Sequence, residues 1–408
     1  MSTAKQKLRI AICGTRGIPH TYSGTEEVLM ELAPRLAARG HHVSVYCRRS
    51  VFRERPPFYK GVRLIYLPSI ETKVLGTPTH TALSMVNAVF RRPDLILVWT
   101  LPSAPFCVLP WLFGRHVAIM VDGCDWRRDK WGPLGKAYLY LSARWIGKIC
   151  PKGVITDTRD MRTLYWEAFR TTSAYIPCGA KVESSSGPDV VRQYGLEPFQ
   201  YYLIASRLVP ENNGALILQA FERTSTNRLL VIAGDANYRS VFAERLRQTQ
   251  DKRVRFLGHV GNRDHVKELH CNAYAYVHGH SAGGTNPSLL KALGCGNCVL
   301  ALNTPSNAGV LSDYGILFEG DAEDLQGKLE YIEHHPEIAE AYRRRAPERI
   351  REAYSWETIT DQYEEFFLRL MAGEDPTRTH SSVAHSETVS FGSEKEVRVS
   401  EEASRCVE

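Results

Sequence analysis

One glycine-rich turn in the second half of the chain carries residues suited to binding an anion. Its residues are Gly283, Gly284, Thr285, Asn286, Pro287 and Ser288. The Asn is typical of a helix N-cap and the Pro of the first helical position, and a helix start favours a bound diphosphate. Arg207, just beyond a predicted strand, would neutralise a departing diphosphate without a metal. An ordinary helix cap and a surface arginine are the alternative interpretation.

A second glycine-rich turn follows the first predicted strand. Its candidate ligand-binding residues are Gly14, Thr15, Arg16, Gly17, Tyr22, Gly24 and Glu26. Glycines let the backbone approach a ligand closely, and a helix start offers amides to an anion or to sugar hydroxyls. The dinucleotide-binding pattern Gly-x-Gly-x-x-Gly is absent, and a tight strand-to-helix turn remains the alternative.

Other chemistry-bearing residues form weaker patterns. His278 and His280, two residues apart at a predicted strand end, would line a pocket or be buried in the core. Cys295 and Cys298 have the spacing of a metal or redox pair, but no second pair accompanies them, and Cys298 begins a predicted buried strand. The chain has no Asp-x-Asp triplet, so we expect no metal. Aromatic and basic residues at 126–138 lack a nucleic-acid recognition module, and no nucleic-acid partner is expected.

Two tandem Rossmann-like units would position these turns. Short apolar runs, which we interpret as strands, alternate with longer amphipathic runs and restart after a polar stretch at 183–188. The predicted strands are 8–13, 42–47, 62–67, 95–99, 117–121, 153–156 and 174–176, then 201–206, 229–233, 254–257, 273–278 and 298–302. This alternation predicts an α/β fold with parallel doubly wound sheets. Residues 337–371 read as helical, and the apolar face at 356–370 must pack on another element.

The predicted domain boundaries follow from this pattern. We expect an N-terminal Rossmann-like domain at 1–178, a second at 179–345, C-terminal helices at 346–372 and a disordered, acidic, serine-rich tail at 373–408. The uncharged stretch 95–114 contains three prolines, which favours a buried strand plus a short helix over a membrane-dipping segment. The N-terminus has no signal-peptide pattern, and the cysteines read as buried hydrophobes of a reducing compartment.

Positive charge is concentrated in the first predicted domain. Residues 1–178 hold 26 Lys and Arg against 12 Asp and Glu, a net +14, whereas the whole chain carries only +6. Residues 179–372 and 373–408 each carry −4. A basic domain favours an anionic partner, and an anionic membrane surface is one such partner. A merely solvated basic domain is the other interpretation.

Several motifs in the same order resemble a known family. They are Gly14 to Pro19, Tyr22 to Glu26, Asp122 to Trp131, Arg207 to Asn213 and His278 to Ser288. On these, the chain resembles GT-B glycosyltransferases of the retaining family 4 type, and more narrowly a bacterial rhamnosyltransferase-like subgroup. The likeness spans residues 8 to about 370. It implies two Rossmann-like domains facing each other across a cleft, with the C-terminal helix crossing back to the first domain.

The resemblance also implies an activity. It is sugar transfer, with rhamnose as one candidate, from a nucleotide-diphosphate donor to a saccharide or lipid-linked acceptor in cell-surface polysaccharide assembly. The mechanism would be retaining and metal-independent, with the nucleotide sugar as substrate and no cofactor. Donor-binding residues would be Arg207, Asn212, Gly283, Gly284, Thr285, Asn286 and Lys291, and the loop 14–26 would lie on the acceptor side. Asp122 stands where the wider family has a catalytic His, and would position or deprotonate the acceptor hydroxyl.

Three departures from the family pattern leave alternatives open. The two family glutamates fall at Gly283 and Lys291, the usual Lys after the Arg is Asn212, and the acid expected after Asn307 is missing. A solvated Lys291 is the alternative to a donor contact. A non-catalytic subunit of a glycan-assembly complex, and a nucleotide-sugar epimerase, are the competing functions. We expect a cytoplasmic protein, peripheral at the inner face of the cell membrane.

Overall fold

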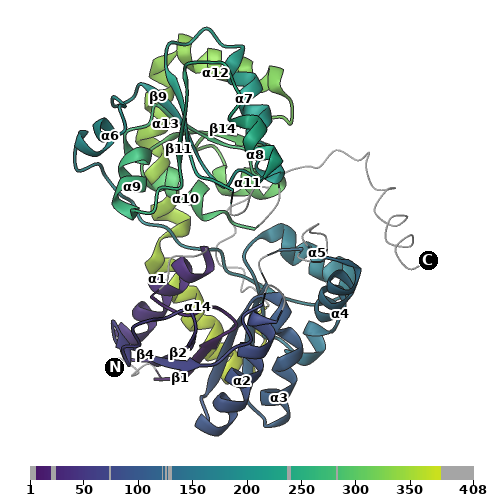
Figure 1. Cartoon of the computed structure of the whole chain (residues 1–408). Helices are drawn as coiled ribbons and strands as arrows, with labels where there is room; N and C mark the ends of the chain where they lie inside the picture. The colour runs from purple at the N-terminus through teal and green to yellow at the C-terminus, as the bar shows by residue number, and fades with distance from the viewer. Residues whose placement is uncertain are drawn as a thin grey trace. The chain divides into compact units, whose positions relative to one another are not determined.

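The computed structural model describes residues 6–19, 24–72, 75–121, 123, 124, 126, 131–236, 240–281 and 284–377. It contains two β-sheets, each covered by helices on both faces (Figure 1). The predicted fold class, two tandem Rossmann-like units with parallel sheets, is confirmed. The expected C-terminal helix that returns to the first unit is also present.

The first sheet has eight strands in the order β3-β4-β2-β1-β5-β6-β7-β8. Their bounds are β1 Arg9–Cys13, β2 His42–Arg48, β3 Phe58–Tyr59, β4 Val62–Leu67, β5 Leu95–Trp99, β6 His116–Val121, β7 Val154–Thr156 and β8 Ala174–Tyr175. All neighbouring pairs are parallel except the short edge pair β3–β4. The strands β5 and β7 are buried at every residue, as expected for parallel strands with helices on both faces.

Helices of the first unit fall into two layers. Their bounds are α1 Gly24–Ala38, α2 Gly76–Arg91, a 3-10 helix Leu101–Cys107, α3 Val108–Leu112, α4 Pro133–Ile149 and α5 Arg159–Phe169. Alternate residues of β1 divide the core, because Ile10 and Ile12 face α1 while Ala11 and Cys13 face α2, α4 and α5. The predicted strand and short helix within 95–114 are confirmed as β5, the 3-10 helix and α3.

The second sheet has six parallel strands in the order β11-β10-β9-β12-β13-β14. Their bounds are β9 Tyr201–Ala205, β10 Leu229–Ala233, β11 Val254–Gly258, β12 Ala275–His278, β13 Cys298–Leu302 and β14 Ile316–Phe318. The helices of this unit are α6 Asp189–Gln193, a 3-10 turn Pro210–Asn212, α7 Gly214–Glu222, α8 Val241–Leu246, α9 Arg263–Cys271, α10 Pro287–Gly294, α11 Pro305–Leu311, α12 Ala322–His334 and α13 Pro336–Arg349. Helices α7, α8 and α12 cover one face, and α6, α9, α10 and α11 cover the other.

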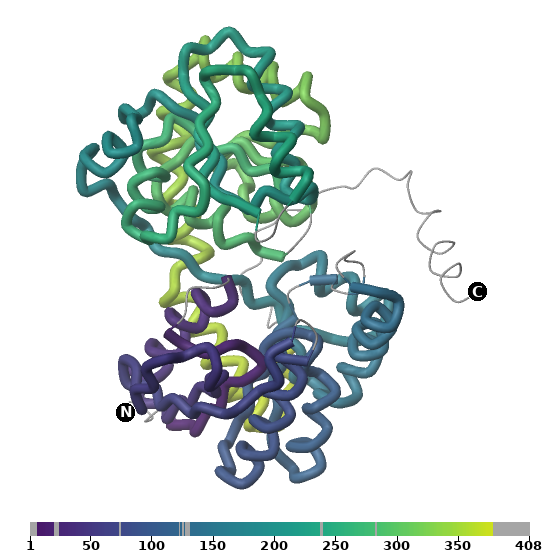
Figure 2. Tube along the Cα trace, viewed as in Figure 1, coloured from purple at the N-terminus to yellow at the C-terminus, as the bar shows by residue number. Residues whose placement is uncertain are grey.

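The predicted helical region 337–371 is two helices separated by a π-helical turn, Ile350–Tyr354. The second helix, α14 (Trp356–Met371), begins at Ser355, whose side chain accepts from Thr358 N. Helix α14 lies beside α1 against the first sheet (Figures 1 and 2). Its apolar face joins the core there, and Tyr363 and Phe367 are fully buried. Glu364 on the same helix pairs with Arg39 and His41, both at 3.1 Å.

Candidate donor and acceptor site

Both predicted ligand-binding turns follow strands at which the order of their sheet reverses. In the first sheet the reversal lies between β1 and β5, and in the second between β9 and β12. Ligands of open parallel sheets bind outside the carboxyl ends of strands at such reversals. The turn 14–19 follows β1, the loop carrying Arg207 follows β9, and the turn before α10 follows β12. The topology therefore places each predicted turn where a Rossmann-like unit binds its ligand.

Arg207 is exposed at the carboxyl end of β9, on a loop that Asn212 shapes from inside. The Asn212 side chain is 5% exposed and donates from Nδ2 to the Arg207 carbonyl oxygen over 2.8 Å. The Val209 amide donates to the same oxygen over 3.0 Å. The structure thus places Asn212 beneath the loop, holding the backbone that presents Arg207.

His278 and His280 lie together at the end of β12, with rings stacked 4.3 Å apart. Burial, and then the positive charge of nearby Arg207, lower the pKa of His280 to about 4. Burial also holds the pKa of His278 well below its usual range. Both imidazoles are therefore neutral at physiological pH and act as hydrogen-bonding groups.

Asn307, whose following residue lacks the acid of the family pattern, organises this part of the site. Its side chain is 4% exposed and donates to the carbonyl oxygens of His280, over 3.0 Å, and Leu302, over 2.9 Å. Asn307 therefore ties the loop after β12 to the end of β13. We did not predict α11, and an Asn shortly after Thr304 and Pro305, which are typical helix-start residues, is the sequence signal that could have indicated this role.

The start of α10 has the predicted cap. Asn286 is the N-cap, and its Oδ1 accepts from Ser288 N over 3.1 Å, while Pro287 occupies the first turn. Asn286 O accepts from the amides of Leu289 and Leu290. These first-turn amides are therefore already hydrogen-bonded within the helix start. The amide of Thr285, just before the N-cap, instead donates to a residue of the first unit.

That residue is Asp157, which directly follows β7. Thr285 N donates to Asp157 Oδ2 over 3.1 Å, and the Thr285 hydroxyl donates to the Asp157 carbonyl oxygen. The carboxylate also packs on Gly284, since a Cβ placed there would lie 1.9 Å from Asp157 Oδ2. Asp157 and Thr285 are 7% and 4% exposed. A carboxylate thus occupies the position before α10 where an anion is favoured, and sequence reasoning did not find it.

The turn after β1 is held tightly against its neighbours. Gly14 has a φ of +89°, and a Cβ on it would lie 2.2 Å from Trp99 O. Gly17 has a φ of +105°, and a Cβ on it would lie 2.5 Å from Cys47 Sγ. Glu26 is 3% exposed and its Oε1 accepts from Arg16 N over 3.1 Å. Thr15 accepts from Gly17 N over 3.1 Å. Glu26 and Thr15 therefore shape the turn that carries Arg16.

A buried cation lies beside this turn. Arg48, at the end of β2, is 6% exposed and donates to Thr77 Oγ1 of α2 over 2.5 Å. Burial, and then the charge of Arg48, lower the pKa of fully buried His80 to about 4. The sequence shows that Arg48 directly follows a predicted strand, but it does not show that the Arg48 side chain is buried.

The structure brings the two predicted turns together. Gly24, at the start of α1, lies so close to Pro287 that a Cβ on it would be 3.2 Å from Pro287 Cγ. Glu27 Oε1 lies 3.4 Å from Arg263 Nη2 of α9. Lys291 is half-buried on α10; burial, and then the charge of Lys291, lower the pKa of His270 on α9 to about 3. Asp122, Tyr22 and Gly283 lie outside the described residues.

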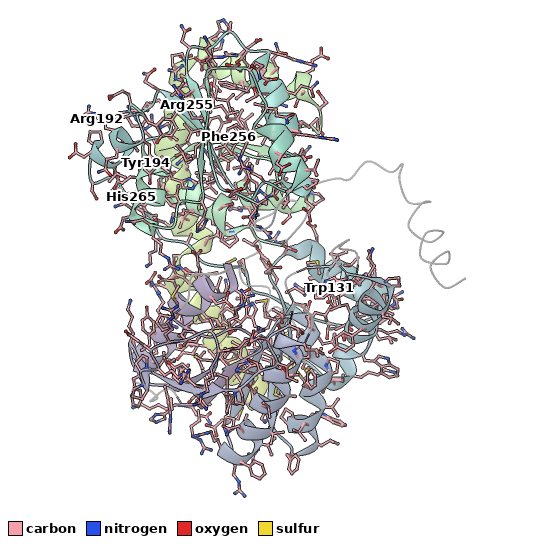
Figure 3. The ribbon with its side chains drawn as sticks, in the orientation of Figure 1. Trp131, Arg192, Tyr194, Arg255, Phe256 and His265 are labelled. Carbon is pink, nitrogen blue, oxygen red and sulfur yellow. The ribbon has the colours of Figure 1, made fainter. Side chains whose placement is uncertain are left out.

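The segment 122–131 is described at Gly123, Cys124, Trp126 and Trp131. Trp126 packs edge-on against Tyr165 and Phe169 of α5, with ring centroids 6.1 and 5.7 Å apart. Trp131 precedes α4 and packs against the same core (Figure 3). On the second unit, Tyr194 Oη and His265 Nδ1 join α6 to α9 over 2.8 Å (Figure 3). In the described ranges, no three His, Cys, Asp or Glu side chains gather as metal ligands.

Two family models match consecutive parts of the chain. Residues 22–184 match the model described as Glycosyltransferase Family 4, and residues 191–349 match the model described as Glycosyl transferases group 1. With the two-sheet fold, these matches define the protein as a glycosyltransferase of the GT-B class. Its first unit is a Family 4-type domain and its second a group 1-type domain. No curated protein sequence matches the chain.

Solved structures share this fold at low sequence identity. HepE of Anabaena in complex with UDP has a TM-score of 0.70 and 16% identity, covering 88% of this chain and 99% of its own. Sucrose-phosphate synthase from Thermosynechococcus elongatus has a TM-score of 0.71 and 17% identity, covering 90% and 100%. WaaG, a glycosyltransferase involved in lipopolysaccharide biosynthesis, has a TM-score of 0.66 and 18% identity, covering 88% and 99%.

Proposed function

We propose that this glycosyltransferase moves a sugar from a nucleotide-diphosphate donor to a saccharide or lipid-linked acceptor in cell-surface polysaccharide assembly. The observation that carries the proposal is the approach of the two predicted turns at Gly24 and Pro287, together with the hydrogen bond between Thr285 and Asp157, which follows β7. A reacting sugar held between them would meet groups from both units. HepE, whose structures contain UDP or UDP-glucose, has the same fold and supports a nucleotide-sugar donor.

The proposed chemistry is departure of a nucleoside diphosphate followed by entry of the acceptor oxygen on the same face of the sugar. Arg207 would neutralise the leaving diphosphate, so no metal is required. The turn at 284–286 would orient the sugar and phosphates, with Lys291 as a second cation. Asp122 would accept or align the proton of the acceptor hydroxyl. Water is excluded when the two units close on the substrates.

The donor sugar is the finer part of the proposal, and the motifs favour rhamnose. The test incubates purified protein with dTDP-rhamnose, UDP-glucose and other nucleotide sugars, with and without a bacterial lipid extract, in the presence and absence of EDTA. We expect a lipid-extractable product whose mass increases by one sugar, formed equally with EDTA. A product from donor alone indicates an epimerase, and donor binding without turnover indicates a non-catalytic subunit; either result overturns the proposal.

Asp157 supplies a prediction about donor affinity. In Asp157→Asn, a carboxylate at the Thr285 amide is replaced by a neutral acceptor of the same shape, so an approaching diphosphate meets less repulsion. We expect nucleoside diphosphates to bind about fivefold more tightly, measured by calorimetry. Glu31→Gln is the matched control, because Glu31 pairs with Lys181 and Arg35 away from Thr285. Weaker binding by Asp157→Asn would instead make Asp157 a residue that supports the donor.

An anionic membrane surface is the proposed partner of the first unit, and the inner face of the cell membrane its proposed location. The support is the net charge of +14 on residues 1–178. None of the helices in the described part of the chain is both long enough and apolar enough to cross a membrane.

A further inference from the structure

The outer layer of the first unit has an unusual charge pattern. Helices α2, α3 and α4 contain no Asp or Glu anywhere along Gly76–Arg91, Val108–Leu112 and Pro133–Ile149. Their charged residues are Arg91, Lys136, Arg144 and Lys148. An ordinary solvated helix face mixes both signs of charge, so one-signed helices point to an anionic partner.

The same helices expose large apolar side chains to solvent. They and Phe113, which follows α3, carry eleven of the nineteen exposed large hydrophobic residues in the described ranges. Leu134 is 89% exposed, Phe90 81%, Leu112 67% and Phe113 60%. The helices are neighbours, because α2 packs on α3 and both α2 and α4 pack on the 3-10 helix at 101–107 (Figure 1). This layer, called here the α2–α4 face, combines apolar and basic groups as membrane-interfacial helices do.

A basic pocket opens at the C-terminal end of α4. It has a volume of about 280 Å³, and its lining includes four cations, Arg144, Lys148, Lys152 and Arg170, with Trp145 and Phe169. None of the residues that line it in the described chain carries a carboxylate. The α4 C-terminus favours Lys148, but Lys152 and Arg170 come from other elements. Four like charges, from α4, from the turn after it and from the C-cap of α5, thus converge on one pocket.

No carboxylate of the described residues neutralises the four cations that line the pocket. Lys148 Nζ lies 4.4 Å above the Trp145 ring, Arg170 lies 5.5 Å above the Trp166 ring, and Lys152 donates to the Gly373 carbonyl oxygen over 3.0 Å. Among the described residues, no carboxylate lies within ion-pair distance of any of the four. The aromatic contacts orient Lys148 and Arg170 without neutralising them. A bound anion would gain from all four charges.

We propose that this pocket binds the phosphate of an anionic lipid headgroup while the α2–α4 face lies in the membrane interface. The inference rests on the proposed membrane-linked acceptor and adds the face and the pocket that would meet the bilayer. Trp and Tyr side chains favour the headgroup region; Trp145 lines the pocket, and Tyr138 and Tyr140 are also exposed on α4. A second copy of this chain is a poor occupant, because pairing two such faces would bring like charges together.

Vesicle sedimentation tests the proposal with the full chain. Vesicles of phosphatidylcholine alone are compared with vesicles that also contain phosphatidylglycerol. The pocket variant combines Arg144→Gln, Lys148→Gln, Lys152→Gln and Arg170→Gln. The matched control removes four exposed charges elsewhere in the same unit, by Arg49→Gln, Arg53→Gln, Arg55→Gln and Lys60→Gln. Nucleoside diphosphate binding is measured in parallel, so a failure of the proposed donor function is seen separately.

We expect wild type to bind the anionic vesicles, the pocket variant to bind them at least tenfold less, and the control to bind nearly as wild type. Equal losses in both variants would show attraction by bulk charge and overturn the pocket. Binding that inorganic phosphate abolishes in solution, with no preference for anionic vesicles, would assign a soluble phosphate ligand and also overturn it. The single change Lys148→Glu, with thermal unfolding of each protein, guards against a misfolded variant: weaker vesicle binding supports the pocket, and unchanged binding contradicts it.

Discussion

Arg207→Ala is expected to lower the turnover number about 100- to 1000-fold, with a much smaller effect on the Michaelis constant for the acceptor. Negative charge on the diphosphate grows as the glycosidic bond breaks, so a cation at this point stabilises the transition state more than the ground state. Asn212 holds the Arg207 backbone from inside the loop, which fixes the cation in place beforehand. The loss should appear in steady-state transfer assays with the donor identified by the nucleotide-sugar panel.

Two further variants separate this role from general charge. Arg207→Lys keeps the charge but loses the planar, two-pronged guanidinium, so an intermediate activity is expected. Arg245→Ala removes an exposed arginine from α8 in the same unit and should leave turnover within about twofold of wild type. If Arg207→Ala retained wild-type turnover, the loop after β9 would not carry the leaving-group chemistry.

Phe367→Ala is expected to lower the free energy of unfolding of the first unit by about 3 to 5 kcal/mol. Phe367 is fully buried between α14 and the first sheet, in the core that contains Ile10 and Ile12. Its removal leaves a cavity and weakens the attachment of a helix that comes from the far end of the chain. Denaturant unfolding followed by tryptophan fluorescence measures the change.

A residue two positions earlier on α14 provides a surface comparison. Glu365 is exposed on α14, with only a 4.0 Å ion pair to Arg369, so Glu365→Ala should change stability by less than about 0.5 kcal/mol. Phe367→Leu retains most of the buried volume and should fall between the two. Equal stability of Phe367→Ala and wild type would mean that α14 adds little to the first core.

Much of the secondary structure could be predicted because parallel strands are buried on both faces. Continuous apolar runs therefore marked β9, observed at Tyr201–Ala205 against a prediction of 201–206, and β13, observed as predicted. The cap at Asn286 was readable because its stabilisation is local. The edge strands β3 and β14 were not predicted, since two or three residues give no usable periodicity. Helix α4 was not predicted either, because exposed apolar residues such as Leu134 interrupt the regular spacing of apolar and polar positions that marks an amphipathic helix.

The sequence by itself determined the fold class, the positions of the two glycine-rich turns predicted to bind ligands and the residues that carry the family resemblance, because these depend on local backbone preferences and on burial patterns along one segment. Only the tertiary structure decided which distant groups meet. Asp157 reaches Thr285 across 128 positions of the chain. Glu26 and Asn212 turn inward to hold their loops, and cations from separate elements converge at the end of α4. Such meetings depend on how the helices and sheets pack, which no periodicity along a single segment encodes.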